Sequence, residues 1–85
     1  MTWNYRVCKS VYKDDGYEEV NFEIHEAHYN PDGSIWAITK NAVSVHSETL
    51  HGIEDVLSMM KDALQKDVID LDTFVFAPQQ FKEVD

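Results

Sequence analysis

Two histidines, His25 and His28, lie three residues apart beside the carboxylates Glu23 and Glu26 in the stretch EIHEAHYNPDGSIW. Imidazole and carboxylate groups are ligands of zinc and other divalent metals. Residues three apart share one side of a helix but point to opposite faces of a strand. This stretch alternates and ends in a Pro-Asp-Gly turn, which is typical of a strand. The sequence therefore predicts no metal site, with His25 on a solvent face and His28 on the face beneath a helix.

Glu26 and Cys8 are the other side chains that could do chemistry. Glu26 takes an apolar position in the alternation, where it could act as an acid or a base. We favour a carboxylate at the rim of the sheet, held by the Tyr5 hydroxyl, because no second catalytic group converges there. Cys8 is predicted to face Glu23, and a neighbouring carboxylate raises the pKa of a thiol. We therefore expect no enzyme and no cofactor, with a small enzyme or metal binder around His25, His28 and Glu26 as an alternative.

The first two predicted elements are strands joined by a hairpin. Residues 3 to 13 alternate, with four apolar side chains on one side: Trp3, Tyr5, Val7 and Val11. Asp15-Gly16 is typical of a two-residue turn whose central residues both need positive φ. With that turn, Val7 faces Ile24 and Val11 faces Val20, so the apolar positions of the two strands share one face.

A third strand is predicted over residues 34 to 39. Asn30-Pro31-Asp32-Gly33 is typical of a turn, because proline presets φ and glycine takes the left-handed position. A three-residue loop of this kind opposes Asn30 with Ser34, and it places Trp36 opposite His28. Alternation slips near residue 26, which a β-bulge would explain.

One helix is predicted to begin after Thr49, a favourable N-cap. Its apolar residues recur at spacings of three and four, in a stripe wide enough to cover a sheet: Leu50, Ile53, Leu57, Met60 and Leu64. The pattern degrades after Lys66, and Phe74-Val75-Phe76 is either an edge strand or a partner-binding segment.

The predicted fold class is α+β, with a three-stranded antiparallel meander and one amphipathic helix packed on one face. A single domain spans residues 1–70, and an acidic-apolar tail, residues 71–85, could add a short extra strand. The predicted core is Val7, Val20, Phe22, Ile24, Leu57 and Met60.

Charge and composition exclude several kinds of partner. Sixteen acidic and seven basic residues give a net charge of −9, which disfavours direct binding to nucleic acid or to an anionic membrane. The same charge is compatible with binding to a basic protein. A lone cysteine indicates a reducing compartment, and the sequence shows neither a signal peptide nor an apolar run of membrane length. We expect a cytoplasmic protein.

Two surfaces are candidates for binding a partner. Between residues 14 and 39 there are seven acids and no Lys or Arg, and the predicted acidic face comprises Asp14, Asp15, Glu18, Glu19 and Glu23. A meander also has two open edges, and an open edge can pair with another chain. The candidates there, at the edge and in the tail, are Ile35, Trp36, Phe74 and Phe76. This predicts a homodimer or strand addition to a partner.

Two resemblances add to this prediction. The opening MTWNYRV, the stretch IHEAHYNPDGSIWAIT and the helix ending MMKDALQKDVID look like a group of short bacterial hypothetical proteins without established activity, over residues 1 to about 70. The strands, the Asp-Gly turn and SETLHGIEDVLSMMKDAL are similar to the sheet-and-helix domain of HicB-type antitoxins. The usual loop glycine and cysteine are absent here, as is a C-terminal DNA-binding domain. This second resemblance implies toxin or partner binding without operator binding.

These observations predict a non-catalytic, acidic protein-binding module, a regulator or inhibitor of bacterial or phage origin. The alternatives are a HicB-like antitoxin without a DNA-binding domain and an inhibitor whose acidic face mimics nucleic acid. The solvated-surface interpretation of the acidic run, in which the charge serves only solubility, also stays open.

Overall fold

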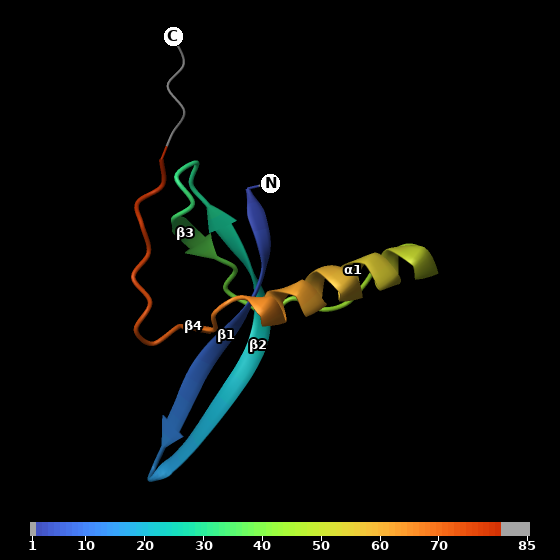
Figure 1. Ribbon diagram of the computed structural model, residues 1–85. Coiled ribbons are helices and arrows are strands. Elements are labelled where there is room, and N and C mark those ends of the chain that lie inside the picture. Colours follow the sequence, from blue (N-terminus) through green and yellow to red (C-terminus); the bar gives the residue numbers. More distant parts are fainter. Residues whose placement is uncertain (1, 81–85) are drawn as a thin grey trace.

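A four-stranded sheet organises residues 2–80, which the computed structural model describes (Figure 1). The strands β1 (Trp3–Asp14), β2 (Tyr17–Tyr29), β3 (Ile35–Ile38) and β4 (Ile69–Asp70) lie in the order β3-β2-β1-β4. The α+β class is confirmed, but the three-stranded antiparallel sheet was wrong. The fourth strand pairs in parallel with β1 at Cys8 and Lys9, and it is Ile69–Asp70 rather than residues 74–76.

The β1–β2 hairpin follows the prediction. Asp15 and Gly16 have φ values of 46° and 84°, as the two-residue turn requires. Val7 pairs with Ile24 and Val11 with Val20, in one register that runs without interruption from Trp3 to Asp14. The turn residues and the apolar alternation therefore predicted the pairing of these two long strands correctly.

The register of β2 with β3 differs from the prediction by one residue. The loop is as expected, because the Asn30 N–H donates to the Ser34 carbonyl at 2.7 Å. A bulge then follows, so that Tyr29 pairs with Ile35 but His28 pairs with Ala37 rather than Trp36. Trp36 is the extra residue, although its ring stays 5.9 Å from that of His28, measured between ring centres.

The helix covers one face of the sheet with only its C-terminal end. α1 (Leu50–Asp62) continues into a 3₁₀ turn, η1 (Ala63–Gln65), and Met60 and Ala63 are buried together with Val7 of β1. In Figure 1 the N-terminal end of α1 extends away from the strands. No helix within residues 2–80 has the length and apolar composition needed to cross a membrane.

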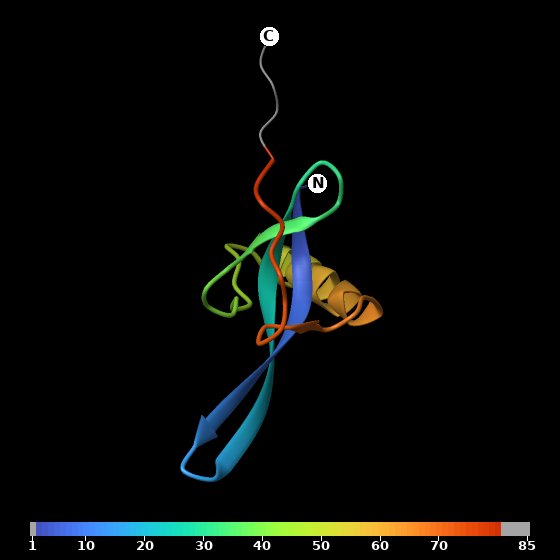
Figure 2. The same ribbon diagram turned by 90° about the vertical axis from the view of Figure 1, so that its left-hand side faces the viewer.

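The opposite face is covered by the C-terminal segment, residues 69–80, which passes in front of the strands in Figure 2 while α1 lies behind them. Cys8, Ala27, Ile35 and Ile69 form a buried cluster there, and Tyr29, Ile38, Leu71 and Phe74 pack against it. The Arg6 guanidinium also lies on this face, donating to the Tyr29 hydroxyl at 3.0 Å and to the Asp67 carbonyl at 2.7 Å. The sheet thus has two covered faces, where the sequence predicted one.

This arrangement corrects half of the predicted core. Val7 and Met60 are buried and Ile24 is half-buried, but Val20, Phe22 and Leu57 are exposed. The two β2 residues lie beyond the part of the sheet that α1 reaches, and Leu57 is 51% exposed although it belongs to the covering helix. Alternation assigned Val20 and Phe22 to the correct face of the sheet, but it does not specify how far the covering helix extends along the strands.

The C-terminal segment also hydrogen-bonds to both outer parts of the sheet. The Leu71 N–H donates to the Lys9 carbonyl of β1 at 2.9 Å, and the Ala77 N–H donates to the Ile35 carbonyl of β3 at 2.9 Å. Buried Asn30 donates to the Pro78 carbonyl and accepts from the Gln80 N–H. These contacts occupy parts of the two edges on which the sequence-based prediction of strand addition depended.

Candidate functional site

The hairpin tip, residues 12–23, projects beyond both covering elements (Figure 1). Every residue in it is exposed except Asn21, which is half-buried. It contains all five acidic residues that the sequence singled out: Asp14, Asp15, Glu18, Glu19 and Glu23. Four large apolar side chains are exposed among them, namely Tyr12, Tyr17, Val20 and Phe22.

The two faces of the hairpin tip differ in chemistry. Tyr12 pairs with Glu19 and Asp14 with Tyr17, so one face combines phenol rings with carboxylates. The other face carries Val20 and Phe22, and there Glu18 lies opposite Lys13. The acidic residues are therefore distributed over both faces and the turn, rather than on the single one-signed face that the sequence predicted.

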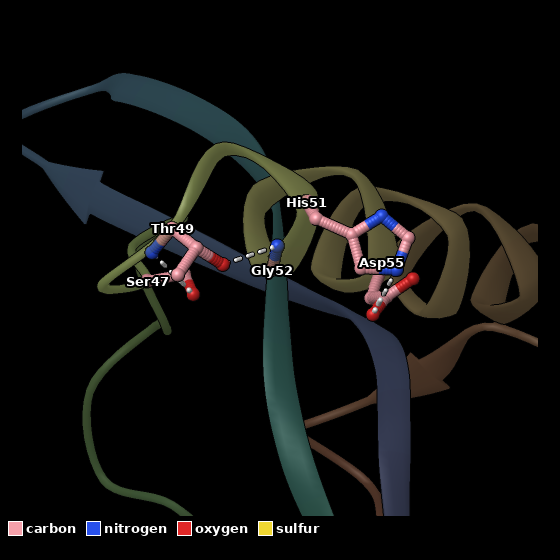
Figure 3. Close-up of polar contacts among 5 residues, drawn as sticks. All are labelled: Ser47, Thr49, His51, Gly52 and Asp55. Carbon is pink, nitrogen blue, oxygen red and sulfur yellow. Dashed lines mark hydrogen bonds and ion pairs between the residues drawn. The ribbon is translucent and has the colours of Figure 1, made fainter.

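The first turn of α1 is held by side-chain capping, shown in Figure 3. The Thr49 hydroxyl accepts from the Gly52 N–H at 2.9 Å, which confirms Thr49 as the N-cap. A Cβ atom at Gly52 would collide with the Ser47 side chain, which folds over the same turn. His51 and Asp55 lie on the outward side, 3.7 Å apart. A larger residue at position 52 would thus displace the Ser47 side chain.

The two histidines of the opening motif do not share a site. His28 lies beside Trp36, as predicted. The placement of His25 on a solvent face was wrong, because its side chain is buried and its Nδ1 lies 2.9 Å from the Thr39 carbonyl. The chain after β3 continues alongside β2, where the Val43 N–H donates to the Ile24 carbonyl, and so covers that position. Within residues 2–80 there is no group of three or more potential metal ligands.

Glu26 and Cys8 both lie within the paired part of the β1–β2 ribbon. Glu26 pairs with Tyr5 across the strands, but the expected hydrogen bond from the Tyr5 hydroxyl to its carboxylate is absent within residues 2–80. The Glu26 N–H donates to the Thr39 hydroxyl at 3.1 Å. Cys8 is buried, and this burial raises the pKa of its thiol above 9.0, which outweighs the opposing effect of the Arg6 charge. A buried thiol with a raised pKa is a poor nucleophile.

The edge and tail candidates divide into buried and accessible residues. Ile35 is buried in the cluster under the C-terminal segment, and Phe74 packs against the same cluster. Trp36 is half-buried. Phe76 is exposed, with its ring edge-on to Phe74 at 5.1 Å between ring centres. Ile35 and Phe74 therefore contribute to the fold, and Phe76 is the accessible member of the set.

An open hollow, among others on this surface, lies at the end of the sheet opposite the hairpin tip. It encloses about 410 Å³ between Trp3, Asn4, Tyr29, Asn30, Pro31 and Gly33. The Tyr29 hydroxyl already donates to the Asn4 side chain at 2.7 Å, and the Asn30 amide is bonded to Ser34 and Pro78. Its described lining contains neither a carboxylate nor a cationic or nucleophilic side chain, so the hollow offers shape and neutral amides rather than catalytic groups.

Comparison with models of protein families, with curated proteins and with solved structures found no match for this chain. The two sequence resemblances therefore stay predictions, and the hairpin tip and the exposed side of α1 are the surfaces from which function can be argued.

Proposed function

We propose that the hairpin tip binds a basic protein and that the chain acts as a non-catalytic regulator or inhibitor. The observation that carries the proposal is the exposure of Tyr12, Tyr17 and Phe22 on a ribbon that also holds five acids and one lysine. Aromatic side chains are enriched at protein interfaces because they bury a large area for little loss of side-chain entropy. A solvated face needs charge for solubility, but it does not need exposed aromatic rings.

The acidic residues determine which partners the surface attracts. A field of one sign accelerates encounter with a partner of the opposite sign and repels partners of the same sign. The aromatic rings would then contribute affinity once the two surfaces are in contact. A partner that fits both properties presents Lys or Arg side chains around an apolar depression.

The test compares two variants with the same change of charge. Glu18→Lys with Glu19→Lys alters the hairpin tip, whereas Glu48→Lys with Asp67→Lys alters exposed acids outside it. Proteins from the source cell are captured on the immobilised chain at low and at high salt. We expect a basic protein that binds the parent and the Glu48/Asp67 variant, is lost with the Glu18/Glu19 variant, and is released by salt.

A Tyr17→Ser variant separates the two contributions. It should weaken capture of the same protein without changing the salt dependence, because it removes a ring and no charge. Equal capture by the two double variants would contradict the proposal, as would a partner without basic character.

A further inference from the structure

Three leucines form an exposed row along one flank of the helix. Leu50 and Leu57 belong to α1 and Leu64 to η1, seven residues apart, with exposed fractions of 90%, 51% and 68%. Seven residues make nearly two helical turns, so the three side chains lie almost in line. Ile53 and Met60 complete the spacing of a heptad repeat, but Ile53 is half-buried and Met60 is buried. One column of this repeat therefore packs within the chain, and the other has no cover within residues 2–80.

The chain exposes more surface than a folded protein of its size. Its accessible area is 6716 Å², whereas the usual scaling for a mass of 9.9 kDa gives about 5,200 Å². The excess is about 1,500 Å², and half of it from each of two copies would make an interface of the standard size, ~1,600 Å² in total. This excess is of the order that a stable dimer buries, and the exposed hairpin tip contributes to it as well as the leucine row.

We propose that a second copy of this chain covers the leucine row, with the two α1 helices packed antiparallel about a twofold axis near Leu57. In this arrangement Leu57 meets the partner's Leu57, and Leu50 meets the partner's Leu64. A twofold interface needs a surface that is complementary to itself, and a row of three similar apolar side chains centred on one of them meets that condition.

The charges beside the row favour the antiparallel direction. Glu54 and Lys61 are exposed and follow Leu50 and Leu57 by four residues, on the outer side of the row. Equivalent flanking positions of two helices face each other in an antiparallel pair, which brings Glu54 close to the partner's Lys61 and Lys61 close to the partner's Glu54. The dimer would then contain two Glu–Lys ion pairs, related to each other by the twofold axis.

The same arrangement keeps the acidic hairpin tips away from the axis, because α1 and the hairpin extend in different directions from the sheet (Figure 1). Two chains of net charge −9 still repel each other. Salt screens this repulsion more than it weakens two local ion pairs. We therefore expect association to strengthen as the salt concentration rises.

Sedimentation of the full chain over a range of about 5–500 µM, a span that brackets weak to moderate association, tests the proposal. Leu57→Glu should raise the dimer dissociation constant by about a hundredfold or more, because two copies lose an apolar contact and gain like charges at the axis. Ser58→Glu adds the same charge at an exposed position next along the helix, outside the row, and should leave the constant nearly unchanged. If Leu57→Glu lowers the helix content, Leu50→Glu at the most exposed leucine replaces it.

A charge exchange tests the direction of the helices. Glu54→Lys and Lys61→Glu should each weaken the dimer about threefold to tenfold, and the double variant should restore it. A double variant as weak as the single ones would overturn the antiparallel arrangement. A parent chain that stays monomeric, or a dimer that survives Leu57→Glu and is lost in Phe22→Thr, would overturn the interface.

Discussion

The two ends of the β1–β2 ribbon share one register but not the same surroundings. Near Cys8 and Ala27 the ribbon lies between α1 and the C-terminal segment, and both side chains are 1% exposed. Toward the turn, the same alternation continues through Val20 and Phe22, but neither element reaches them and Phe22 is 62% exposed. The covered end looks more polar in the sequence, since Asn4, Arg6 and Ser10 surround Cys8.

This contrast shows what strand alternation does and does not specify. Alternation assigns side chains to a common face, because successive residues of a strand point to opposite sides. Burial then depends on which other element reaches that face. The hairpin tip has apolar residues at the correct spacing for a core and uses them at the surface, whereas the covered end builds its core partly from small residues.

The largest effect is expected at the covered end. Ile69→Ala removes a buried side chain from the cluster of Cys8, Ala27 and Ile35, and it should lower the free energy of unfolding by about 2–4 kcal/mol. Urea denaturation followed by circular dichroism measures the change. A loss below 1 kcal/mol would show that the C-terminal segment covers the sheet without stabilising it.

Removal of the C-terminal segment beyond Leu71 should have the next largest effect. The shortened chain loses the packing of Phe74 and the Ala77–Ile35 hydrogen bond, and buried Asn30 loses its partners Pro78 and Gln80. We expect a loss of about 1–3 kcal/mol and faster hydrogen exchange of the Asn30 side-chain amide, which donates to the Pro78 carbonyl in the full chain. Unchanged exchange of this amide would contradict the packing of the segment against Asn30.

A smaller effect is expected at Asp32, which receives hydrogen bonds from the Ser34 hydroxyl, the Ser34 N–H and the Gln80 side chain. These bonds, led by that of the Ser34 hydroxyl, lower the pKa of Asp32 below its ordinary 3.8. Because the folded pKa is depressed, the contribution to stability is present above pH 3.8 and is lost as the pH falls through the folded pKa.

The measurement for Asp32 is the exchange rate of the Gln80 side-chain amide against pH. The rate is compared with that of a free side-chain amide at the same pH: this protection should be lost in acid in the parent chain and be absent at every pH in Asp32→Ala. A parent profile identical to that of the variant would mean that Asp32 does not hold Gln80.

The smallest effect is expected at the hairpin tip. Phe22→Thr keeps a residue that favours strands and removes an exposed ring, so the free energy of unfolding should change by no more than about 0.5 kcal/mol. The same denaturation experiment used for Ile69→Ala measures it. A loss comparable to that of Ile69→Ala would remove the distinction between the two ends of the ribbon.

The parts of the fold that depend on local chemistry were predictable from the sequence. Asp15-Gly16 fixed the hairpin and its register, and Thr49 fixed the start of the helix. The five acidic candidates are all exposed, but the hairpin geometry that distributes them over both faces was not foreseen.

The parts that depend on distant segments were not predictable. β4 is two residues long and pairs with a strand about sixty positions earlier, so no local pattern marks it. The burial of His25 depends on the path of the chain after β3, and the exposure of Leu57 depends on the orientation of α1 relative to the sheet. Each of these outcomes is decided by tertiary packing, which a single sequence does not reveal.

The position of the C-terminal segment also has a consequence for the order of folding. The hairpin closes through neighbouring residues and can form within microseconds, whereas the contacts of Gln80 with Asn30 and of Leu71 with Lys9 join parts of the chain that are far apart. Contacts of long sequence separation form late, and during synthesis these are the last described residues to be made. Until the C-terminal segment is in place, it does not cover the Cys8 side of the sheet. The rate at which a thiol reagent labels Cys8 therefore reports when the C-terminal segment covers this side during folding. In the folded protein, the same rate reports how often the segment detaches.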